Sequence, residues 1–407
     1  MTLGWEERTL TKPLPGPVDI WIQSASGGES MLSGMVLTQL AKATKADTPL
    51  SILATAGTKQ GIDSLHKVWG QLDSTTQSAL QLTIRYFPLD APATMARAFA
   101  ATRPQLAVIV ETELWPGYFM AAQQAQVPVL LINGRMSEKS FRSYRLFRTF
   151  FMQYGPKRVL AISEEDRSRF AYLLGPERVT TLNNLKFDRI HPKELSSTAP
   201  THHPLLAEPS PFIVLGSIRQ KEKAKILATI YAILQERKDI VIGLFPKHIE
   251  WADDWVASLA QQGISAQKRS TTKTPAPPCS VLVWDTFGEL AETYQYADAA
   301  FVGGSLVSQG GQNFLEPLAF GVPTIIGPHW DNFSWVGRDI VKSGLVREVS
   351  DEVELSRVLL SALKRPSSRD ATLALVRDYL HPRQGGTNVV CKEILSILSS
   401  TTKRMHA

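Results

Sequence analysis

Short apolar runs alternate with amphipathic stretches along the first half of the chain. Segments with helical character lie between these runs, including 29–44, 92–102, 116–126 and 164–174. Strands that alternate with helices in this way predict a parallel sheet with helices on both faces. The runs predicted as strands are DIWIQ (19–23), LSILAT (50–55), LTIRYFP (82–88), LAVIVE (106–111), VPVLLIN (127–133), RVLAIS (158–163) and RVTTLN (178–183).

The same alternation starts again near residue 211. Helices are predicted near 221–236, 250–262 and 288–296. Two such halves predict an α/β protein with two Rossmann-like, doubly wound domains facing each other across a cleft, where ligands bind at the carboxyl ends of the strands. The second set of predicted strands is FIVLGS (212–217), IVIGLFP (240–246), VLVWDT (281–286), AAFVGGS (299–305) and PTIIGP (323–328).

The stretch between the two halves, 190–211, is rich in Pro, Ser and His and lacks periodicity, which indicates an interdomain linker. We therefore expect a first domain over 1–190, a linker over 191–210 and a second domain over 211–370. The last segment, 371–407, is predicted as helices that cross back onto the first domain.

Composition narrows the classes of protein. The chain is 43% hydrophobic, which is ample for a buried core, and its length of 407 residues suggests two or three domains. The two cysteines, Cys279 and Cys391, match no metal or redox spacing, so a reducing, cytosolic compartment is expected. There is no HExxH, CxxC, EF-hand or Asp-x-Asp pattern, so no metal site is predicted and the expected mechanism needs no metal.

The formal net charge is +6 at pH 7, which suits an anionic partner. We do not expect nucleic acid as that partner, because no aromatic-and-basic RNA-binding signature or zinc finger occurs. The first nineteen residues are polar and broken by proline, and no apolar run reaches about 18 residues. The protein is therefore expected to be soluble or peripheral to a membrane.

The stretch SASGGE (24–29), which follows the first predicted strand, has two interpretations. Ser26 and Glu29 have the spacing of a capping box at the start of a helix. That pattern does not explain Gly27 and Gly28, because each glycine in a helix costs about 1 kcal/mol relative to alanine. Glycines at such a junction also allow a ligand to come close, so a ligand role for Glu29 stays open beside the capping role.

A second glycine-rich stretch, 300–328, has the same ambiguity. Asn313 can cap a helix with Glu316 as its capping-box partner, and Pro317 suits the first turn. Capping does not account for the two glycine pairs at 303–304 and 310–311. We favour a nucleotide here, with backbone N–H groups facing phosphate and Glu316 accepting ribose hydroxyls.

Eight motifs in one order resemble the bacterial 3-deoxy-D-manno-octulosonic acid (Kdo) transferases, a family of GT-B glycosyltransferases. A single motif would be weak, but ETELWP, NLKFD and FVGGSL in this order are specific. The motifs cover most of the chain and are SASGGE (24–29), ETELWP (111–116), INGRMSEKSFRSY (132–144), NLKFD (184–188), GSIRQKE (216–222), FPKH (245–248), DTFGEL (285–290) and FVGGSLVSQGGQNFLEP (301–317).

The resemblance implies roles for individual residues. Glu29 matches a general base that takes the proton from the acceptor hydroxyl, and Glu111 and Lys186 match residues that stabilise the transition state. Without the resemblance, Lys186 could equally be a surface lysine and Glu111 part of a structural ion pair. The positions that match the segments around the donor nucleotide are Gly216, Ser217, Pro246, Lys247, Phe287, Gly288, Glu289, Asn313, Phe314, Leu315 and Glu316.

The function implied by the resemblance is inverting, metal-independent transfer of Kdo from CMP-Kdo to a lipid A precursor in lipopolysaccharide biosynthesis. It implies no cofactor and a peripheral position at the cytoplasmic face of the inner membrane. Two alternatives are a GT-B-like sugar-nucleotide epimerase and a transferase that uses a related CMP-activated acidic sugar. A relative that has lost activity is disfavoured, because Glu29, Glu111 and Lys186 are all retained.

The sequence departs from the family pattern at several points. The usual membrane-spanning anchor is not seen, so attachment is peripheral or the sequence is trimmed. The histidine common in the first motif is replaced by Gln23 or Ser24, and a Thr-His pair is replaced by Ile218-Arg219. Gln312 and Lys247 stand where His and Arg are usual, and lysine lacks the bidentate fork with which arginine holds phosphate.

The stretch RMSEKSFRSYRLFRTFF (135–151) places Arg142, Arg145 and Arg148 at three-residue spacing, with Lys139 on nearly the same helix face. A solvated helix face is the ordinary interpretation. Beside an acceptor that carries phosphates and acyl chains, the same stripe would engage lipid phosphate and an anionic bilayer. Both interpretations stay open.

Overall fold

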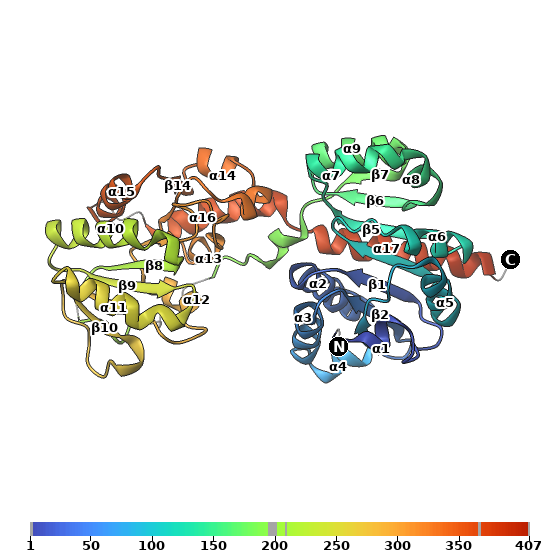
Figure 1. Cartoon of the computed structure of the whole chain (residues 1–407), viewed down its shortest axis with the longest axis horizontal. Coiled ribbons are helices and arrows are strands. Elements are labelled where there is room, and N and C mark those ends of the chain that lie inside the picture. The colour runs from blue at the N-terminus through green and yellow to red at the C-terminus, as the bar shows by residue number, and fades with distance from the viewer. Residues whose placement is uncertain (1–2, 194–201, 208–209, 365–367, 406–407) are drawn as a thin grey trace. The chain divides into compact units, whose positions relative to one another are not determined.

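The computed structural model consists of two compact units (Figure 1). The first unit is Met1–Arg189 with Arg383–Ala407, and the second is Ile190–Pro382. The chain therefore leaves the first unit once and returns to it near its end. The residues that the structure describes are 3–193, 202–207, 210–364 and 368–405.

The sequence places the domain boundaries at residues 190 and 371, whereas the structure divides the chain after Arg189 and again after Pro382. Helix α16 (Arg369–Leu380) consequently belongs to the second unit, and only α17 (Gly386–Met405) belongs to the first. Of the expected linker, 194–201 and 208–209 lie outside the described residues.

The first unit contains a sheet of seven parallel strands in the order β3-β2-β1-β4-β5-β6-β7, and all seven strands expected there are confirmed. The chain proceeds from β1 to one edge of the sheet and then returns to β4 on the other side of β1. Doubly wound sheets bind ligands at the carboxyl ends of the two strands where the order reverses. The strands are β1 (Ile20–Ser24), β2 (Leu50–Ala56), β3 (Leu80–Tyr86), β4 (Leu106–Val110), β5 (Val129–Gly134), β6 (Arg158–Ala161) and β7 (Val179–Thr181).

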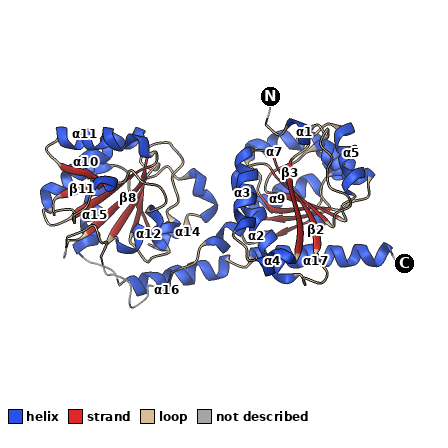
Figure 2. Cartoon of the chain, turned by 90° about the horizontal axis from the view of Figure 1, so that it is seen from below, coloured by secondary structure: helices blue, strands red, loops and turns tan. Residues whose placement is uncertain are grey.

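Helices cover both faces of this sheet (Figure 2). The sequence pattern missed α3, because only Gly61 and Leu65 are buried in it and its apolar stripe is therefore narrow. The helices of the first unit are α1 (Trp5–Arg8), α2 (Gly27–Ala43), α3 (Lys59–Gly70), α4 (Ser74–Ser78), α5 (Pro92–Thr102), α6 (Pro116–Gln124), α7 (Glu138–Tyr144), α8 (Arg148–Tyr154), α9 (Glu164–Leu174) and α17, with a 3₁₀ turn η3 at Leu185–Arg189.

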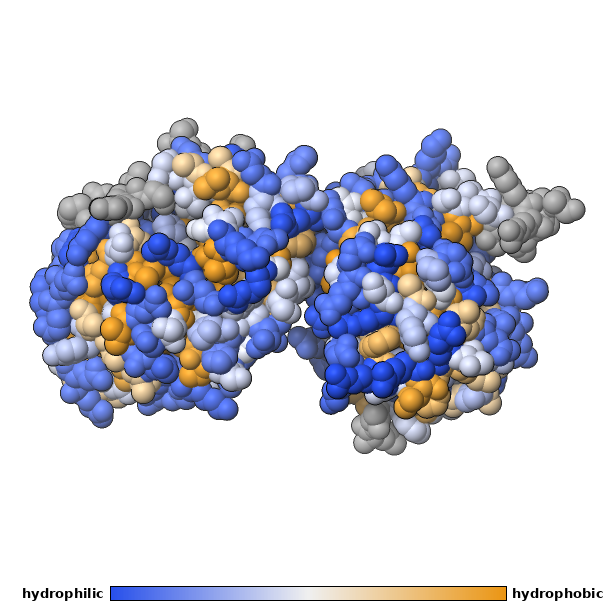
Figure 3. Space-filling view, turned by 90° about the horizontal axis from the view of Figure 1, so that it is seen from above, coloured by the Kyte–Doolittle hydropathy of each residue, from blue (hydrophilic) through white to orange (hydrophobic). Residues whose placement is uncertain are grey.

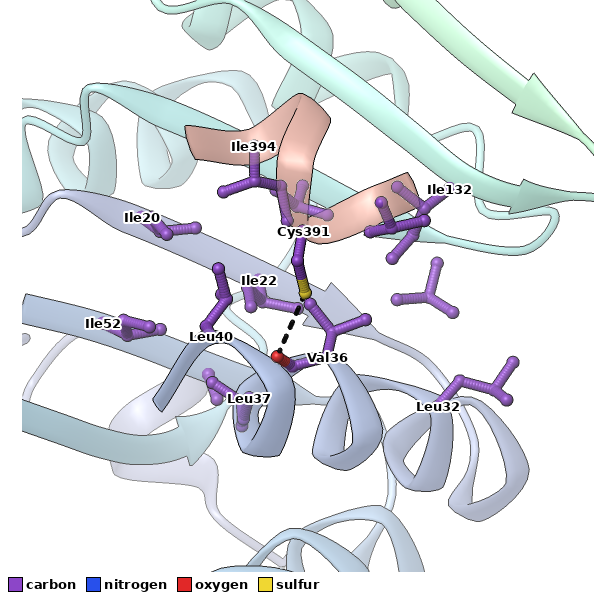
Figure 4. Close-up of a cluster of buried hydrophobic side chains, with 14 of the residues drawn as sticks. Ile20, Ile22, Leu32, Val36, Leu37, Leu40, Ile52, Ile132, Cys391 and Ile394 are labelled. Carbon is purple, nitrogen blue, oxygen red and sulfur yellow. Dashed lines mark hydrogen bonds between the residues drawn. The ribbon is translucent and has the colours of Figure 1, made fainter. Parts of the chain in front are cut away.

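Helix α17 completes the hydrophobic core on one face of the first sheet. Cys391 and Ile394 of α17 point into a cluster with Ile22, Val36 and Leu40 from β1 and α2 (Figure 4). The Cys391 thiol donates to the carbonyl oxygen of Val36 over 3.7 Å, and burial raises the pKa of this thiol to about 12. Cys391 therefore acts as a small apolar side chain and not as a reactive thiol.

The start of α17 is fastened to the 3₁₀ turn η3. The carboxylate of Asp188 accepts hydrogen bonds from the N–H groups of Gly385 at 2.6 Å and Thr387 at 2.7 Å. A Cβ atom at Gly386 would lie only 2.3 Å from the carbonyl oxygen of Asn183, so this close contact requires glycine. The segment where the chain returns therefore packs directly on the turn that carries Lys186.

The second unit also has seven parallel strands, in the order β10-β11-β9-β8-β12-β13-β14, and the five expected strands are confirmed. Here β8 and β12 flank the point where the order reverses. The two missed strands are short, lie at the sheet edges and read SAQK and VRE, so they carry little apolar pattern. The strands are β8 (Phe212–Ile218), β9 (Val241–Pro246), β10 (Ser265–Lys268), β11 (Ser280–Val283), β12 (Ala299–Val302), β13 (Thr324–Ile326) and β14 (Val346–Glu348).

The three helices expected in the second half are confirmed as α10, α11 and α12, the last continued by a 3₁₀ turn at Tyr294–Tyr296. No helix within the described ranges has both the length and the apolar character needed to span a bilayer. The helices of the second unit are α10 (Lys223–Glu236), α11 (Ala252–Gln261), α12 (Leu290–Thr293), α13 (Leu315–Leu318), α14 (Asp339–Lys342), α15 (Glu352–Lys364) and α16.

Candidate active site

The three residues predicted as catalytic lie at one edge of the first sheet. Glu29 is in the first turn of α2, which follows β1, and Glu111 directly follows β4. Lys186 lies in η3, and its Nζ is 2.7 Å from Oε1 of Glu111. The structure therefore brings these residues together at the point where the strand order reverses.

Glu29 forms the capping arrangement at the start of α2. The Ser26 hydroxyl accepts a hydrogen bond from the N–H of Glu29 at 3.4 Å, and the Glu29 carboxylate accepts from that hydroxyl at 3.1 Å and from the N–H of Ala25 at 2.6 Å. A Cβ atom at Gly28 would meet only the Ser26 hydroxyl, at 4.0 Å, so the space beside Glu29 is open on this side. Capping and access for a ligand are compatible in this geometry.

The surroundings of Glu29 favour its protonated form. Burial raises the pKa of Glu29, the hydrogen bond from Ala25 opposes this change, and the negative charge of Glu111 adds to it. A carboxylate whose pKa lies above its usual value is a better proton acceptor at neutral pH.

Glu111 is held in a strained conformation. Its φ of 62° is in the left-handed region, which is uncommon for a residue with a side chain. The N–H of Glu111 donates to the carbonyl oxygen of Ile132 at 2.9 Å, and only 7% of the residue is exposed. The backbone therefore turns the carboxylate toward Lys186 at the end of the strand.

Asn133 was missed in the sequence, although it lies in one of the quoted motifs. It is fully buried, has a φ of 52°, and its Nδ2 is 3.5 Å from Oε1 of Glu111. Its Oδ1 accepts a hydrogen bond from the N–H of Leu185 at 2.9 Å. Asn133 thus joins Glu111 to the turn that carries Lys186.

Glu113 was also missed, although ETELWP contains it. Burial raises the pKa of Glu113 to about 7, and the negative charges of Glu29 and Glu111 add to this, while Trp115 opposes it. The sequence gives no sign that Glu113, the second glutamate of ETELWP, lies near the carboxylates of Glu29 and Glu111.

Across the residues that the structure describes, no group of three or more His, Cys, Asp or Glu side chains has the arrangement of a metal site.

In the second unit, the loops after β8 and β12 approach each other closely. Ser217 has a φ of 55°, and the register between β8 and β9 shifts between Leu215 and Ile218. A Cβ atom at Gly216 would lie 2.0 Å from the hydroxyl oxygen of Tyr294, so no side chain fits there. The N–H of Gly303 donates to the carbonyl oxygen of Gly216 at 2.8 Å, which holds the two strand ends together.

The motif around Asn313 forms a compact turn. Asn313 donates from Nδ2 to Oε1 of Glu316 at 2.8 Å, and its Oδ1 accepts from the N–H of Leu315 at 3.3 Å. Helix α13 has only four residues, so any anion binding here depends on local N–H groups and not on a helix dipole. Leu315 and Phe314 point into the core, and only their backbone is left for a ligand.

The other predicted donor residues have distinct surroundings. Pro246 is buried at the end of β9, and the exposed Lys247 donates its N–H to the carbonyl oxygen of Ile218 at 2.8 Å. Phe287 is 79% exposed and Gly288 has a φ of 89°.

The carboxylate of Glu289 already accepts from Trp284, Thr286 and Arg269 at 2.9–3.0 Å. These bonds lower the pKa of Glu289 although burial alone would raise it. The carboxylate therefore serves to hold its own loop.

The basic stretch does not form a single helix, so the expectation that Lys139, Arg142, Arg145 and Arg148 share one helix face is wrong. Helix α7 ends at Tyr144, a 3₁₀ turn covers Arg145–Phe147, and α8 begins at Arg148. The rings of Tyr144 in α7 and Phe151 in α8 pack together, with centroids 5.5 Å apart.

Comparison with known proteins places these features in a family. The family model of 3-deoxy-D-manno-octulosonic-acid transferase (kdotransferase) matches residues 3–189. The chain is 30% identical over 381 residues to the 3-deoxy-D-manno-octulosonic acid transferase of Bordetella pertussis, covering 92% of this chain and 86% of that protein.

Among solved structures, a glycosyltransferase from Rickettsia africae ESF-5 gives a TM-score of 0.57 at 10% identity, covering 95% of this chain and 99% of that one. A UDP-N-acetylglucosamine 2-epimerase gives 0.53 at 12% identity, covering 88% and 91%. These likenesses establish the two-domain GT-B fold, which transferases and epimerases share. The match in sequence over most of both chains is more specific, and it shows that this chain belongs to the 3-deoxy-D-manno-octulosonic acid transferase family.

Proposed function

We propose that the protein transfers Kdo from CMP-Kdo to a lipid A precursor by an inverting, metal-independent mechanism. The observation that carries the proposal is the position of Glu29, whose pKa is raised, beside the Lys186–Glu111 pair at the reversal point of the first sheet. We name Kdo as the donor sugar because the chain belongs to the Kdo transferase family.

In the proposed reaction, Glu29 removes the proton from the attacking hydroxyl of the acceptor. The acceptor oxygen then forms a bond to the anomeric carbon of Kdo while the bond from that carbon to the phosphate of CMP breaks. The leaving CMP takes the electron pair, and attack on the face opposite to CMP inverts the anomeric centre. The open space at Gly28 supports this role, because it leaves room beside the carboxylate for an acceptor.

Lys186 has the charge to balance the anionic groups of the reaction. We assign it to the sugar carboxylate or the departing phosphate, where a fixed ammonium stabilises negative charge in the transition state. Glu111 and Asn133 hold it in place through the 2.7 Å contact to Glu111 and the 2.9 Å bond to the adjacent Leu185. Because Lys186 carries this charge, the proposed mechanism needs no divalent ion.

We assign CMP to the second unit, at the ends of β8 and β12. The N–H groups of Gln312 and Asn313 donate no hydrogen bond to any described residue, which suits them to phosphate. Glu316 is assigned to the ribose hydroxyls, and the exposed Lys247 and Phe287 to the phosphate and base sides of the nucleotide. The carboxylate of Glu289 already accepts hydrogen bonds from Arg269 and Trp284, so we assign the contact with CMP to the backbone of its loop.

We further propose that the segment from α7 to α8 contacts the cytoplasmic surface of the inner membrane. Leu146 and Phe147 are 78% and 61% exposed, and the charged Arg145 lies beside them. Exposed apolar side chains flanked by basic residues suit an anionic bilayer interface. Figure 3 looks onto the side of the first unit where Figure 1 labels α7, α8 and α9, and hydrophobic and hydrophilic residues are interspersed there.

The test is incubation of the purified protein with CMP-Kdo, with and without a lipid A precursor, followed by mass spectrometry. We expect the acceptor to gain the mass of Kdo, CMP to be released in equal amount, and EDTA to have no effect. Change of the donor without acceptor would instead favour the epimerase, whose fold is equally compatible with this chain. Consumption of a different CMP-activated acidic sugar in preference to CMP-Kdo would correct the donor.

A further inference from the structure

Glu222 is a fully buried glutamate in the second unit, with 0% of the residue exposed. It lies at the end of a 3₁₀ turn, Gln220–Glu222, between β8 and α10. A buried carboxylate is stable only when its oxygens are paired or hydrogen-bonded, so its partners indicate what it is for. None of the roles assigned above uses this residue.

The partners of Glu222 are four backbone N–H groups. Its Oε2 accepts from Gly304 at 2.6 Å and Arg219 at 3.1 Å, and its Oε1 accepts from Leu306 at 2.9 Å and Ser305 at 3.0 Å. Three of these donors are consecutive residues located 82 to 84 positions further along the chain. The carboxylate therefore ties the loop after β8 to the loop after β12.

Three consecutive N–H groups that point at one acceptor form an arrangement that otherwise binds anions. Here the carboxylate of the protein itself fills the arrangement, and these donors are no longer available to a phosphate of CMP. Glu222 and the donor phosphate therefore have separate positions, with the phosphate at the turn before α13.

The loop held by Glu222 in turn shapes that turn. The N–H of Gly311 donates to the carbonyl oxygen of Gly304 at 2.7 Å, directly next to the glycine pair that leads to Asn313. Ser305 accepts through its hydroxyl from the N–H of Gly327 at 2.8 Å and through its carbonyl oxygen from the N–H of His329 at 3.0 Å. Hydrogen bonds through Gly304 and Ser305 thus connect the Glu222 carboxylate to the loops that carry Gly311 and Gly327.

We propose that Glu222 is a positioning residue for the donor nucleotide, acting by fixing the loop Gly304–Leu306 and, through it, the turn at Gly311–Asn313. The proposal rests on the assignment of CMP to the second unit. Glu222 touches no part of the donor in this account, so its removal changes donor affinity through the backbone and leaves acceptor binding unaltered.

The test uses the full chain with Glu222→Gln and Glu222→Ala. In Glu222→Gln, an NH₂ group replaces one oxygen and meets backbone donors, so we expect CMP affinity by calorimetry to fall at least tenfold. The KM for the acceptor stays within twofold of the wild type. Glu236→Gln, on the exposed end of α10, is the matched control and should bind CMP normally.

The alanine variant provides a second readout that a merely structural residue would not show. It leaves four N–H donors around a space of carboxylate size, so acetate should restore CMP binding in Glu222→Ala while chloride at the same ionic strength should not. Unchanged CMP affinity in both folded variants, or no recovery with acetate, would overturn the proposal. Failure of both variants to fold would also overturn it, because the carboxylate would then be a requirement of the fold.

A separate measurement distinguishes this proposal from the assignment of CMP. Amide hydrogen exchange at Gly311 without ligand should be faster in Glu222→Gln than in the wild type, because the hydrogen bond to Gly304 is weakened. This holds even if the wild-type protein binds no CMP, in which case the donor assignment fails and the link between the loops remains. Equal exchange rates at Gly311 would show that Glu222 does not fix the turn.

Discussion

Lys186 and Glu111 are 75 positions apart in the chain and form an ion pair with Nζ 2.7 Å from Oε1. The lysine side chain is 24% exposed and that of the glutamate 9%, so water weakens the attraction less than it does at a surface. Glu29 lies near enough for the charge of Glu111 to raise its pKa. The ammonium of Lys186 therefore reduces the repulsion between the two carboxylates.

Replacing Lys186 should show how much its charge stabilises the buried Glu111 carboxylate. Lys186→Met leaves the Glu111 carboxylate buried without its cation, which should lower the free energy of unfolding by about 2–3 kcal/mol and abolish transfer. The double variant Lys186→Met/Glu111→Gln should recover most of the stability but none of the activity. Denaturant unfolding and transfer rates on both proteins check this. Equal stability of the single and double variants would contradict a coupled pair.

Glu29→Gln separates the two roles of the helix start. Glutamine keeps the shape and an oxygen for the N–H of Ala25, so melting temperature and CMP affinity should change little. The transfer rate should fall by about 10²–10⁴-fold, the usual loss when a general base is removed. Ser26→Ala is the control, because it removes the cap at a cost of about 1 kcal/mol and keeps the base. Near-normal transfer by Glu29→Gln would mean that the residue only caps the helix.

Glu113 should make stability fall as pH rises. Its pKa is about 7 in the folded protein and 4.5 ordinarily, so between these pH values the folded state holds a proton that the unfolded state has lost. The free energy of unfolding is therefore higher at the acidic end of this window than above pH 7. The difference is about 1–2 kcal/mol after allowance for screening by water.

Glu113→Gln should therefore raise the melting temperature at pH 8 and leave it nearly unchanged at pH 4.5. Thermal unfolding of variant and wild type at both pH values provides the measurement. A stabilisation that is equal at the two pH values would show that the charge of Glu113 is not the cause.

Glu316→Ala tests the donor assignment. Loss of a charge-assisted hydrogen bond to ribose should weaken CMP binding by about 1.5–3 kcal/mol, with no change on adding EDTA. Glu316→Ala also removes the acceptor of the Asn313 side-chain amide. Asn313→Ala is therefore measured as a control, to separate loss of that internal hydrogen bond from loss of the bond to ribose. Calorimetry that finds wild-type affinity in Glu316→Ala, or a strict need for a divalent ion, would refute the assignment.

The membrane proposal predicts a salt-dependent effect. Charge reversal of Arg142, Arg145 and Arg148 should reduce binding to anionic liposomes, more at low salt because high salt screens surface charge. Arg145→Glu should contribute most, because Arg142 pairs with Glu138 and Arg148 donates to the carbonyl oxygen of Tyr172.

Leu146→Ser should weaken liposome binding at high salt as well, where only apolar contact remains. Lys342→Glu, on exposed α14 in the second unit, is the control for charge alone. Liposome binding that is unaltered in the folded arginine and leucine variants would leave the segment as an ordinary solvated surface.

The sequence could predict most strands because their runs are rich in buried apolar residues, and it missed β10 and β14 because SAQK and VRE are short and mostly polar. It could locate Glu29, Glu111 and Lys186 through their motifs. It could not give a role to Glu222, because three of its four partners are backbone groups more than 80 residues away and backbone donors leave no mark in a sequence. The same reason hid Asn133, whose main contact is the N–H of Leu185.

The return of α17 to the first unit has a consequence for how the protein is made. A nascent chain that has emerged from the ribosome as far as residue 189 has every strand of the first sheet, yet it lacks Val390, Cys391 and Ile394 of that unit's core. Its apolar face over β1 and α2 stays uncovered while the whole second unit is synthesised. The half of the enzyme that is translated first can therefore complete its core only after the other half has been synthesised.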